Sequence, residues 1–214
     1  MKDKAKLILE MPITEAENNL NADCDILGLR IAKYEEVQIL KGLLPHIKKP
    51  LMIRDTAEGK ILPDIIKTLD RECILGIVTE NNYKTIVPLA IDGNHTIIIR
   101  TPIDINLAKE MNILTTDMGL EKIITDTDIG GIGYGFEYGY STIEKIKTEG
   151  QNDKYLNKPI ISFVAEETSK TKEAKDKNMA GFLEITSISA VYAGGADYIV
   201  CNSQKALQTM RRIV

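Results

Sequence analysis

The sequence of 214 residues predicts an α/β fold, a single-domain (β/α)8 (TIM) barrel over residues 1–214. Three observations support this prediction. Short runs of branched apolar residues alternate eight times with segments of helical periodicity, and no linker, low-complexity tract or repeat divides the chain. The length also suits the smallest such barrels, which have roughly 200 residues. An open doubly wound sheet would give the same alternation and is the alternative.

Four strands are predicted in the first half of the chain, at residues 7–9, 25–29, 51–53 and 73–78. A weak, Asn-rich helix is expected at 14–20, and a stripe of Val37, Leu40 and Leu44 predicts a helix that ends at Pro45. The clearest helical spacing, i, i+3, i+4 and i+7, is that of Leu62, Ile65, Ile66 and Leu69. The helix expected around 83–90 contains Pro88, which should kink it or end it early.

The second half contains strands at 97–99, 123–125, 160–164 and 197–200. Asp104 stands where a helix N-cap belongs, before the apolar stripe Leu107, Met111, Leu114 and Met118, and Gly119 closes that helix. Further helices are predicted at 138–147 and 181–193 and, from Ala206, Met210 and Ile213, at the end of the chain. The lysine-rich run 169–178 reads as a solvated loop or an exposed helical turn.

Composition limits the class of protein. With 43% hydrophobic and 27% charged residues the chain has the composition of a soluble globular protein, and a formal net charge of −4 argues against a nucleic-acid partner. No apolar run approaches the roughly 20 residues of a membrane span, and residues 1–4 do not resemble a signal peptide, so we expect a cytoplasmic protein with no membrane partner. Cys24, Cys73 and Cys201 are isolated, which indicates buried thiols in a reducing compartment.

Polar residues follow the predicted strands and would gather on one rim of a barrel. They are Arg30, Arg54, Asp55, Glu80, Asn81, Asp104, Asn106, Asp126, Asp128, Glu166 and Asn202. Carboxylates and amides around a mouth suit a ligand with an amide or guanidine-like edge, such as a pterin or a corrinoid, and a carboxylate such as Asp126 can accept two parallel N–H bonds. The alternative is that rims are polar because they are solvated, and that Asp104 only caps its helix.

The run Gly130-Gly131-Ile132-Gly133-Tyr134-Gly135 lets the backbone approach a ligand closely and leads into a helix start with free N–H groups. It does not match GxGxxG, so dinucleotide binding is not expected; a turn that needs glycine for its φ angles is the alternative. No Ser-His-Asp or Cys-His set can be assembled, and His46 and His95 fall at the opposite end of the barrel. We therefore predict no catalytic residue and no metal ligand.

Two stretches, TPIDINLAKEMNILTTDMGL (101–120) and DTDIGGIGYGFEYGYSTIEKIK (126–147), resemble the small (delta) subunit of the corrinoid iron–sulfur protein of the acetyl-CoA synthase/decarbonylase complex. Weaker similarity extends through ILGIVTENNYK and GNHTIII. The resemblance implies a TIM barrel of the pterin-methyltransferase type and a large partner subunit that carries a [4Fe–4S] cluster. It also implies a corrinoid (cobamide) at the subunit interface, which takes a methyl group from a methyl-tetrahydropterin and passes it to acetyl-CoA synthase.

The chain also departs from that family's pattern. It is shorter, with an abbreviated segment between the first two strands; Thr127 stands where the family has proline, and the family has an aromatic residue near Arg100. The expected function is an accessory subunit of a corrinoid methyl carrier in one-carbon metabolism such as methanogenesis. The alternatives are a stand-alone pterin-dependent methyltransferase that grips its pterin with Asp104, Asn106 and Asp126, and a shortened structural paralogue. The cofactor-binding candidates, for a corrinoid or a tetrahydropterin, are Asn81, Asp104, Asn106, Asp126, Asp128, Gly130, Gly131, Gly133 and Asn202.

Overall fold

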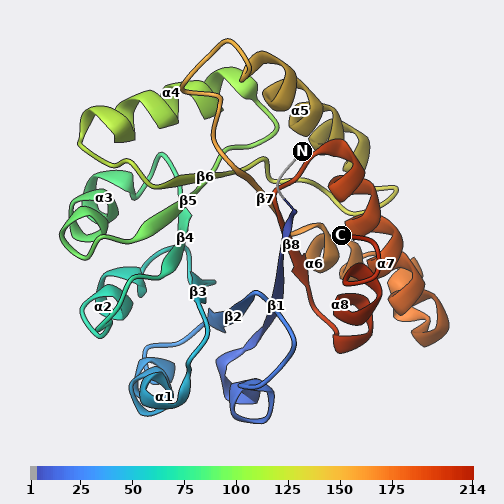
Figure 1. The fold of residues 1–214 in the computed structure, drawn as a ribbon, viewed down its shortest axis with the longest axis horizontal. Helices are drawn as coiled ribbons and strands as arrows, with labels where there is room; N and C mark the ends of the chain where they lie inside the picture. Colours follow the sequence, from blue (N-terminus) through green and yellow to red (C-terminus); the bar gives the residue numbers. More distant parts are fainter. Residues whose placement is uncertain (1–3) are drawn as a thin grey trace.

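A computed structural model describes residues 4–214 and has the predicted barrel (Figure 1). Eight parallel strands follow one another around it in chain order, and β1 pairs with β8, so the sheet is closed and the open-sheet alternative is excluded. The strands are β1 (Lys6–Pro12), β2 (Ile26–Ile31), β3 (Leu51–Asp55), β4 (Ile74–Val78), β5 (Thr96–Arg100), β6 (Ile123–Asp126), β7 (Ile160–Ser162) and β8 (Tyr198–Cys201).

Helices surround the barrel on its outer side (Figure 1). They are α1 (Glu36–Leu43), α2 (Leu62–Ile66), α3 (Tyr83–Asp92), α4 (Ile105–Asp117), α5 (Phe136–Glu149), α6 (Val164–Ser169), α7 (Lys177–Gly194) and α8 (Gln204–Met210). The weak helix expected at 14–20 is a 3₁₀ helix over Ile13–Asn19, and α3 continues through Pro88 to Asp92. The lysine-rich run is not only loop, because it contains a short 3₁₀ helix, Glu173–Lys175, and the start of α7.

Two hydrophobic cores follow from the alternation of side chains along each strand. Outward-facing residues pack against the helices and make the larger core, which includes the buried Cys24, Cys73 and Cys201. Inward-facing residues fill the barrel: Ile8, Ile26, Met52, Ile98, Ile124, Ile161, Phe163 and Val200. Because the strand period is two, the next inward positions after these residues lie at the carboxyl end of the barrel.

Capping and side-chain contacts fix the loops at that end. Asp104 is the N-cap of α4, as predicted, and accepts the Asn106 N–H at 2.8 Å. The buried Asp55 accepts the N–H groups of Ala57, Ile61 and Leu62 at 2.6, 2.7 and 2.9 Å, and so holds the β3–α2 loop against the start of α2. This loop forms one wall of the cavity described below.

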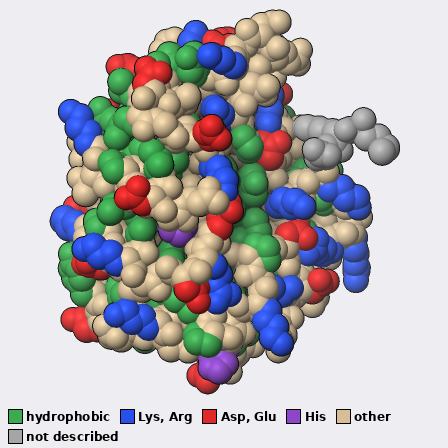
Figure 2. Space-filling view, turned by 60° about the vertical axis from the view of Figure 1, so that its left-hand side comes forward, with side chains coloured by type: hydrophobic (Ala, Val, Ile, Leu, Met, Phe, Trp, Pro, Cys, Tyr) green, Lys and Arg blue, Asp and Glu red, His purple; other side chains and the backbone are tan. Residues whose placement is uncertain are grey.

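The outer surface is mixed in charge. Acidic and basic side chains are interspersed over the face that Figure 2 shows, in keeping with the formal net charge of −4. Within residues 4–214, no helix is both long enough and apolar enough to cross a lipid bilayer.

Candidate functional site

Charged side chains occupy inward-facing positions at the carboxyl end of the barrel. Each lies two residues beyond an apolar side chain of the barrel interior, where the strand period returns to the same face. The four are Glu10 after Ile8, Arg54 after Met52, Arg100 after Ile98, and Asp126 after Ile124. A layer of ion pairs therefore lies directly above the hydrophobic interior.

Arg54 is the most buried cation of this layer, with 4% of its surface exposed. Its Nε donates to Glu10 Oε1 at 2.8 Å and its Nη2 to Glu10 Oε2 at 2.7 Å, and Nη2 also donates to Glu166. Gly28 on β2 leaves room for Glu10, because a Cβ there would come within 3.0 Å of the glutamate Cβ. Burial alone would lower the pKa of Arg54, but the two carboxylates outweigh it and raise that pKa.

Arg100 forms a second cluster with Asp126 and Asp128. Its Nε donates to Asp126 Oδ2 at 2.6 Å and lies 3.3 Å from Asp128 Oδ1. Asp126 is fully buried, and its other oxygen accepts the Asp128 N–H at 3.0 Å. Both Asp126 oxygens thus have partners within the chain, and this carboxylate holds Arg100 in place.

One aromatic ring links the two clusters. Phe163, which follows β7 and is buried, lies under both guanidinium groups. The Cζ atoms of Arg54 and Arg100 are 4.3 and 5.6 Å from the ring centroid. Such cation–π contacts favour keeping both cations over the barrel centre.

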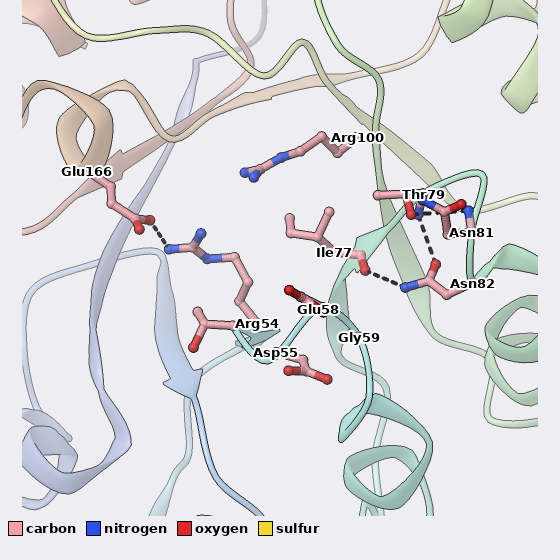
Figure 3. Close-up of a pocket in the computed structure, with 11 residues that line it drawn as sticks. Arg54, Asp55, Glu58, Gly59, Ile77, Thr79, Asn81, Asn82, Arg100 and Glu166 are labelled. Atoms are coloured by element: carbon pink, nitrogen blue, oxygen red, sulfur yellow. Dashed lines mark hydrogen bonds and ion pairs between the residues drawn. The ribbon is translucent and has the colours of Figure 1, made fainter. Parts of the chain in front are cut away.

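A cavity of about 640 Å³ opens beside these residues (Figure 3). In the figure, the guanidinium groups of Arg54 and Arg100 reach into the same space, and the β4–α3 loop lies on the other side. Asn82 stabilises that loop by donating to the Ile77 carbonyl at 3.2 Å and accepting the Thr79 N–H at 2.9 Å. The lining residues are Arg54, Asp55, Thr56, Glu58, Gly59, Ile77, Thr79, Asn81, Asn82, Arg100 and Glu166.

The structure brings only some of the sequence-predicted site residues together. Asn81 lines this cavity, and it also lines a smaller hollow of about 200 Å³ together with Arg100 and Asp128. Asp126 is buried and paired with Arg100. Asp104 is engaged in its cap, and Asn106 is exposed in the first turn of α4. Asp104 and Asp126 both have hydrogen-bond partners within the chain. The binding of a pterin by Asp104, Asn106 and Asp126 therefore remains a prediction.

Asn202 lies in a different hollow, of about 470 Å³, between α6, α7 and the start of α8. Its Oδ1 is buried and has no hydrogen-bond partner among the described residues. The Thr168 hydroxyl, which lines the same hollow, is also buried without a partner. The backbone N–H groups of Asn202 and Ser203 are taken by Glu184 Oε1, at 2.7 and 3.0 Å.

Packing and backbone conformation explain why glycine occupies four positions of the run 130–135. A Cβ on Gly130 would come within 2.3 Å of the Tyr134 carbonyl oxygen, and one on Gly131 within 2.7 Å of the Glu167 carbonyl oxygen. Gly133 and Gly135 have φ angles of 78° and 94°. Close packing and positive φ angles account for these four glycines, and their predicted role in cofactor binding remains a prediction.

Histidine and cysteine do not contribute to the site. His95 is buried at the amino end of β5, where its Nδ1 accepts the Cys73 N–H at 3.2 Å and burial lowers its pKa. Among residues 4–214, no group of three or more His, Cys, Asp or Glu side chains is placed to hold a metal ion.

Sequence reasoning missed three members of the site: Glu10, Arg100 and Phe163. A signal for them was present, because each stands two residues beyond an apolar residue that faces the barrel interior. Extending that alternation past the strand ends would have placed all three inside the mouth.

Exposed apolar side chains surround the mouth. They lie in the loops and the first two helical turns that follow the strands, and Tyr138 and Phe182 are the most exposed, at 63% each. The set, which we call the apolar rim, is Tyr34, Ile103, Tyr134, Tyr138, Met179 and Phe182. Apolar groups exposed around a concave site are typical of a surface that another molecule covers.

Comparison with known proteins identifies similar chains. A family model described as CO dehydrogenase/acetyl-CoA synthase delta subunit matches residues 16–210. The acetyl-CoA decarbonylase/synthase complex subunit delta of Archaeoglobus fulgidus is 24% identical over 60% of this chain and 30% of its own length. That of Methanopyrus kandleri is 23% identical over 60% of this chain and 34% of its own length. The chain thus spans about a third of the length of these curated relatives.

Solved structures share the architecture. Dihydropteroate synthase from Thermus thermophilus in complex with 4-aminobenzoate has a TM-score of 0.71 and 12% identity, covering 99% of this chain and 93% of its own. Dihydropteroate synthase from Coxiella burnetii in complex with pteroic acid has a TM-score of 0.70 and 11% identity, covering 100% and 93%. At this level of identity the likeness establishes the TIM-barrel fold alone.

Proposed function

Because the chain belongs to the CO dehydrogenase/acetyl-CoA synthase delta subunit family, we propose that it is a barrel subunit of an acetyl-CoA decarbonylase/synthase complex. In this proposal the carboxyl end of the barrel faces a corrinoid that a large corrinoid iron–sulfur subunit presents. The observation that carries the proposal is the combination, at one end of the barrel, of exposed apolar side chains with buried polar atoms that lack a partner.

The unpartnered polar atoms suit the edge of a corrinoid. The Thr127 and Thr168 hydroxyls and Asn202 Oδ1 follow β6, β7 and β8, and none has a hydrogen-bond partner among residues 4–214. A buried polar atom without a partner costs about 1–3 kcal/mol, which a bound molecule can recover. A corrinoid carries primary amide side chains that both donate and accept hydrogen bonds, so these three residues would hold its edge. When bound, the corrinoid supplies a cobalt that accepts and releases the methyl group.

The apolar rim suits a protein partner around that ligand. Its aromatic members bury large areas at little cost in side-chain entropy, and residues of this type dominate binding energies at interfaces. Tyr138 is in the first turn of α5 and Phe182 in the second turn of α7, and these two helices contact each other. A partner seated on this rim would also exclude water from the mouth.

The mouth itself favours an accessory role over stand-alone catalysis. Glu10, Glu166 and Asp126 are each paired with an arginine, so none is a free base or acid. Burial alone would raise the pKa of Glu166, but Arg54 outweighs it and keeps that pKa below its usual value, so the carboxyl stays ionised at neutral pH. Transfer of a methyl group from a methyl-tetrahydropterin to acetyl-CoA synthase would then rest on the cobalt and on the partner subunits.

The test is to mix the purified chain with a corrinoid-loaded large iron–sulfur subunit. We expect co-elution in size-exclusion chromatography and a change in the corrinoid absorption spectrum. The double variant Tyr138→Lys/Phe182→Lys should weaken the complex by about 2 kcal/mol for each side chain, or roughly 30-fold each.

The matched control is Ile91→Lys, which places the same charge on an exposed apolar residue in the last turn of α3, at the opposite end of the barrel. This variant should bind as the wild type does. Absence of any complex and of any spectral change with the wild-type chain would refute the proposed function.

A further inference from the structure

We propose that the space between Arg54 and Arg100 is a binding site for the carboxylate group of a small organic acid. The inference stands on the geometry of the mouth and does not require the proposed function. Among residues 4–214, Arg54 pairs with Glu10 and Glu166 and Arg100 pairs with Asp126, and no carboxylate is hydrogen-bonded to both guanidinium groups.

The first argument is that hydrogen-bond donors are left over. Arg54 uses Nε and Nη2 for Glu10 and Glu166, and Arg100 uses Nε for Asp126. Within the described part of the chain, Arg54 Nη1 and both Nη atoms of Arg100 have no hydrogen-bond acceptor. Figure 3 shows both guanidinium groups reaching into the same space, Arg54 from β3 and Arg100 from β5. The planar guanidinium group matches the two oxygens of a carboxylate.

The second argument is electrostatic. The guanidinium carbons of Arg54 and Arg100 lie 4.3 and 5.6 Å from the centroid of the Phe163 ring. Burial and the charge of Arg54 both act to lower the pKa of Arg100, although Asp126 and Asp128 outweigh them and raise it. Like charges held close together in a partly buried site repel each other, because the surrounding protein screens them less than water does. An anion between the free edges would remove this repulsion without breaking any existing ion pair.

The third argument concerns the charge of the ligand. The arginines Arg30, Arg54 and Arg100 and the ammonium of Lys170 balance the carboxylates Glu10, Glu166, Asp126 and Asp128. Asp55 and Glu58, which also line the cavity, add further negative charge, so the mouth offers directed N–H donors and not an excess of positive charge. This arrangement suits a singly charged group such as a carboxylate better than a doubly charged phosphate.

The remaining cavity has room for the rest of an acid. From the two guanidinium groups it extends past Ile77 to Thr79 and Asn81. The wall there combines an apolar side chain with a hydroxyl and an amide. A cavity of about 640 Å³ lies within the range of small-molecule sites, roughly 300–1,000 Å³, so a ligand larger than acetate would fit.

The experiment is an NMR titration of the whole chain with sodium acetate, with chloride used to keep the ionic strength constant. The Nε–H signals of Arg54 and Arg100 should shift together and saturate, with a Kd on the order of 1–10 mM. The double variant Arg100→Gln/Asp126→Asn removes the free donors of Arg100 without leaving a buried unpaired carboxylate, and it should bind at least about tenfold more weakly.

Two further variants complete the test. Arg100→Lys keeps the charge beside Asp126 but loses the planar fork, so it should also bind several-fold more weakly while retaining the fold. Arg212→Gln removes one positive charge from an exposed arginine far from the mouth and should bind as the wild type does. Shifts that do not saturate, or equal affinities in the wild type and both Arg100 variants, would overturn the proposal.

Discussion

Polar and charged groups at the two ends of the barrel differ in how completely they are paired. At the amino end, Asp25 accepts two bonds from Arg211, at 2.9 and 3.1 Å, and the Leu7 N–H at 2.8 Å. Asp197, also at this end, accepts the Ile160 N–H at 2.7 Å and pairs with Lys147. At the carboxyl end, two arginines keep N–H groups without acceptors, and buried polar atoms of Thr127, Thr168 and Asn202 have no partner among residues 4–214.

This contrast separates interactions that hold the fold from groups that we propose to bind a ligand. Bonds at the amino end connect strand starts to helix ends. Three of the five buried side-chain atoms without a partner among residues 4–214 follow strands at the carboxyl end, where barrels of this class place their sites, and the other two, Asn112 Oδ1 and Thr116 Oγ1, are on α4. The predictions below test whether the two ends differ in this way.

The largest expected effect is on stability at the mouth. Arg54→Met removes the cation between Glu10 and Glu166 and leaves the fully buried side chain of Glu10 with Arg30, at 3.9 Å, as its one cationic neighbour among residues 4–214. Removing one partner of a buried pair costs about 3–5 kcal/mol, and urea unfolding should report a loss of this size. The double variant Glu10→Gln/Arg54→Met should recover part of it, because no buried charge is then left unpaired. A loss below about 1 kcal/mol in Arg54→Met would mean that the ion pairs do not support the barrel.

A smaller effect is expected in the pH dependence of stability, which should differ between Asp25 at the amino end and Asp128 at the carboxyl end. Burial alone would raise the pKa of Asp25, but hydrogen bonds from Arg211 and Leu7 outweigh it and lower that pKa. The ionised carboxylate therefore stabilises the fold above the unfolded value of about 3.9, and this contribution is lost as the pH falls through the lowered pKa. Asp25→Asn should cost about 2 kcal/mol at neutral pH, and the difference from wild type should shrink in acid.

Asp128 at the mouth should show the opposite slope. Burial raises its pKa, so its ionised form opposes folding, and the wild type should gain stability relative to Asp128→Asn as the pH falls from the raised pKa towards about 3.9. At neutral pH the substitution should change stability by less than about 0.5 kcal/mol. Urea unfolding of both variants between neutral and acidic pH checks the pair; parallel slopes would mean that the two ends do not differ.

Much of the fold could be predicted from the sequence because its periodicities are local. Each short apolar run became a strand, and the cap at Asp104 formed as its position indicated. The errors lie at element ends, where local signals compete with tertiary packing. The spacing of Leu62 to Leu69 predicted a longer helix than Leu62–Ile66, and the strand expected at 160–164 ends at Ser162 because Val164 begins α6.

The location of the site could be predicted from the sequence, but the ion pairs within it could not. Arg54, Asp126 and Glu166 were expected on one rim, and they do lie at the barrel mouth. The partners could not be read from the chain, since Arg54 and Glu166 are 112 residues apart and meet only when the sheet closes. That Arg100 would take the carboxylate of Asp126 follows from the register of β5 and β6, where the two residues are side by side.

The most direct test of the central claim, that the carboxyl end is the ligand-bearing end, is hydrogen–deuterium exchange of the chain with and without a corrinoid-loaded large iron–sulfur subunit. We predict slower exchange in the segments 101–104, 127–139 and 177–184, which surround the mouth, and unchanged exchange at the strand starts near Asp25, His95 and Asp197. Protection confined to the amino end, or no protection at either end, would contradict the account.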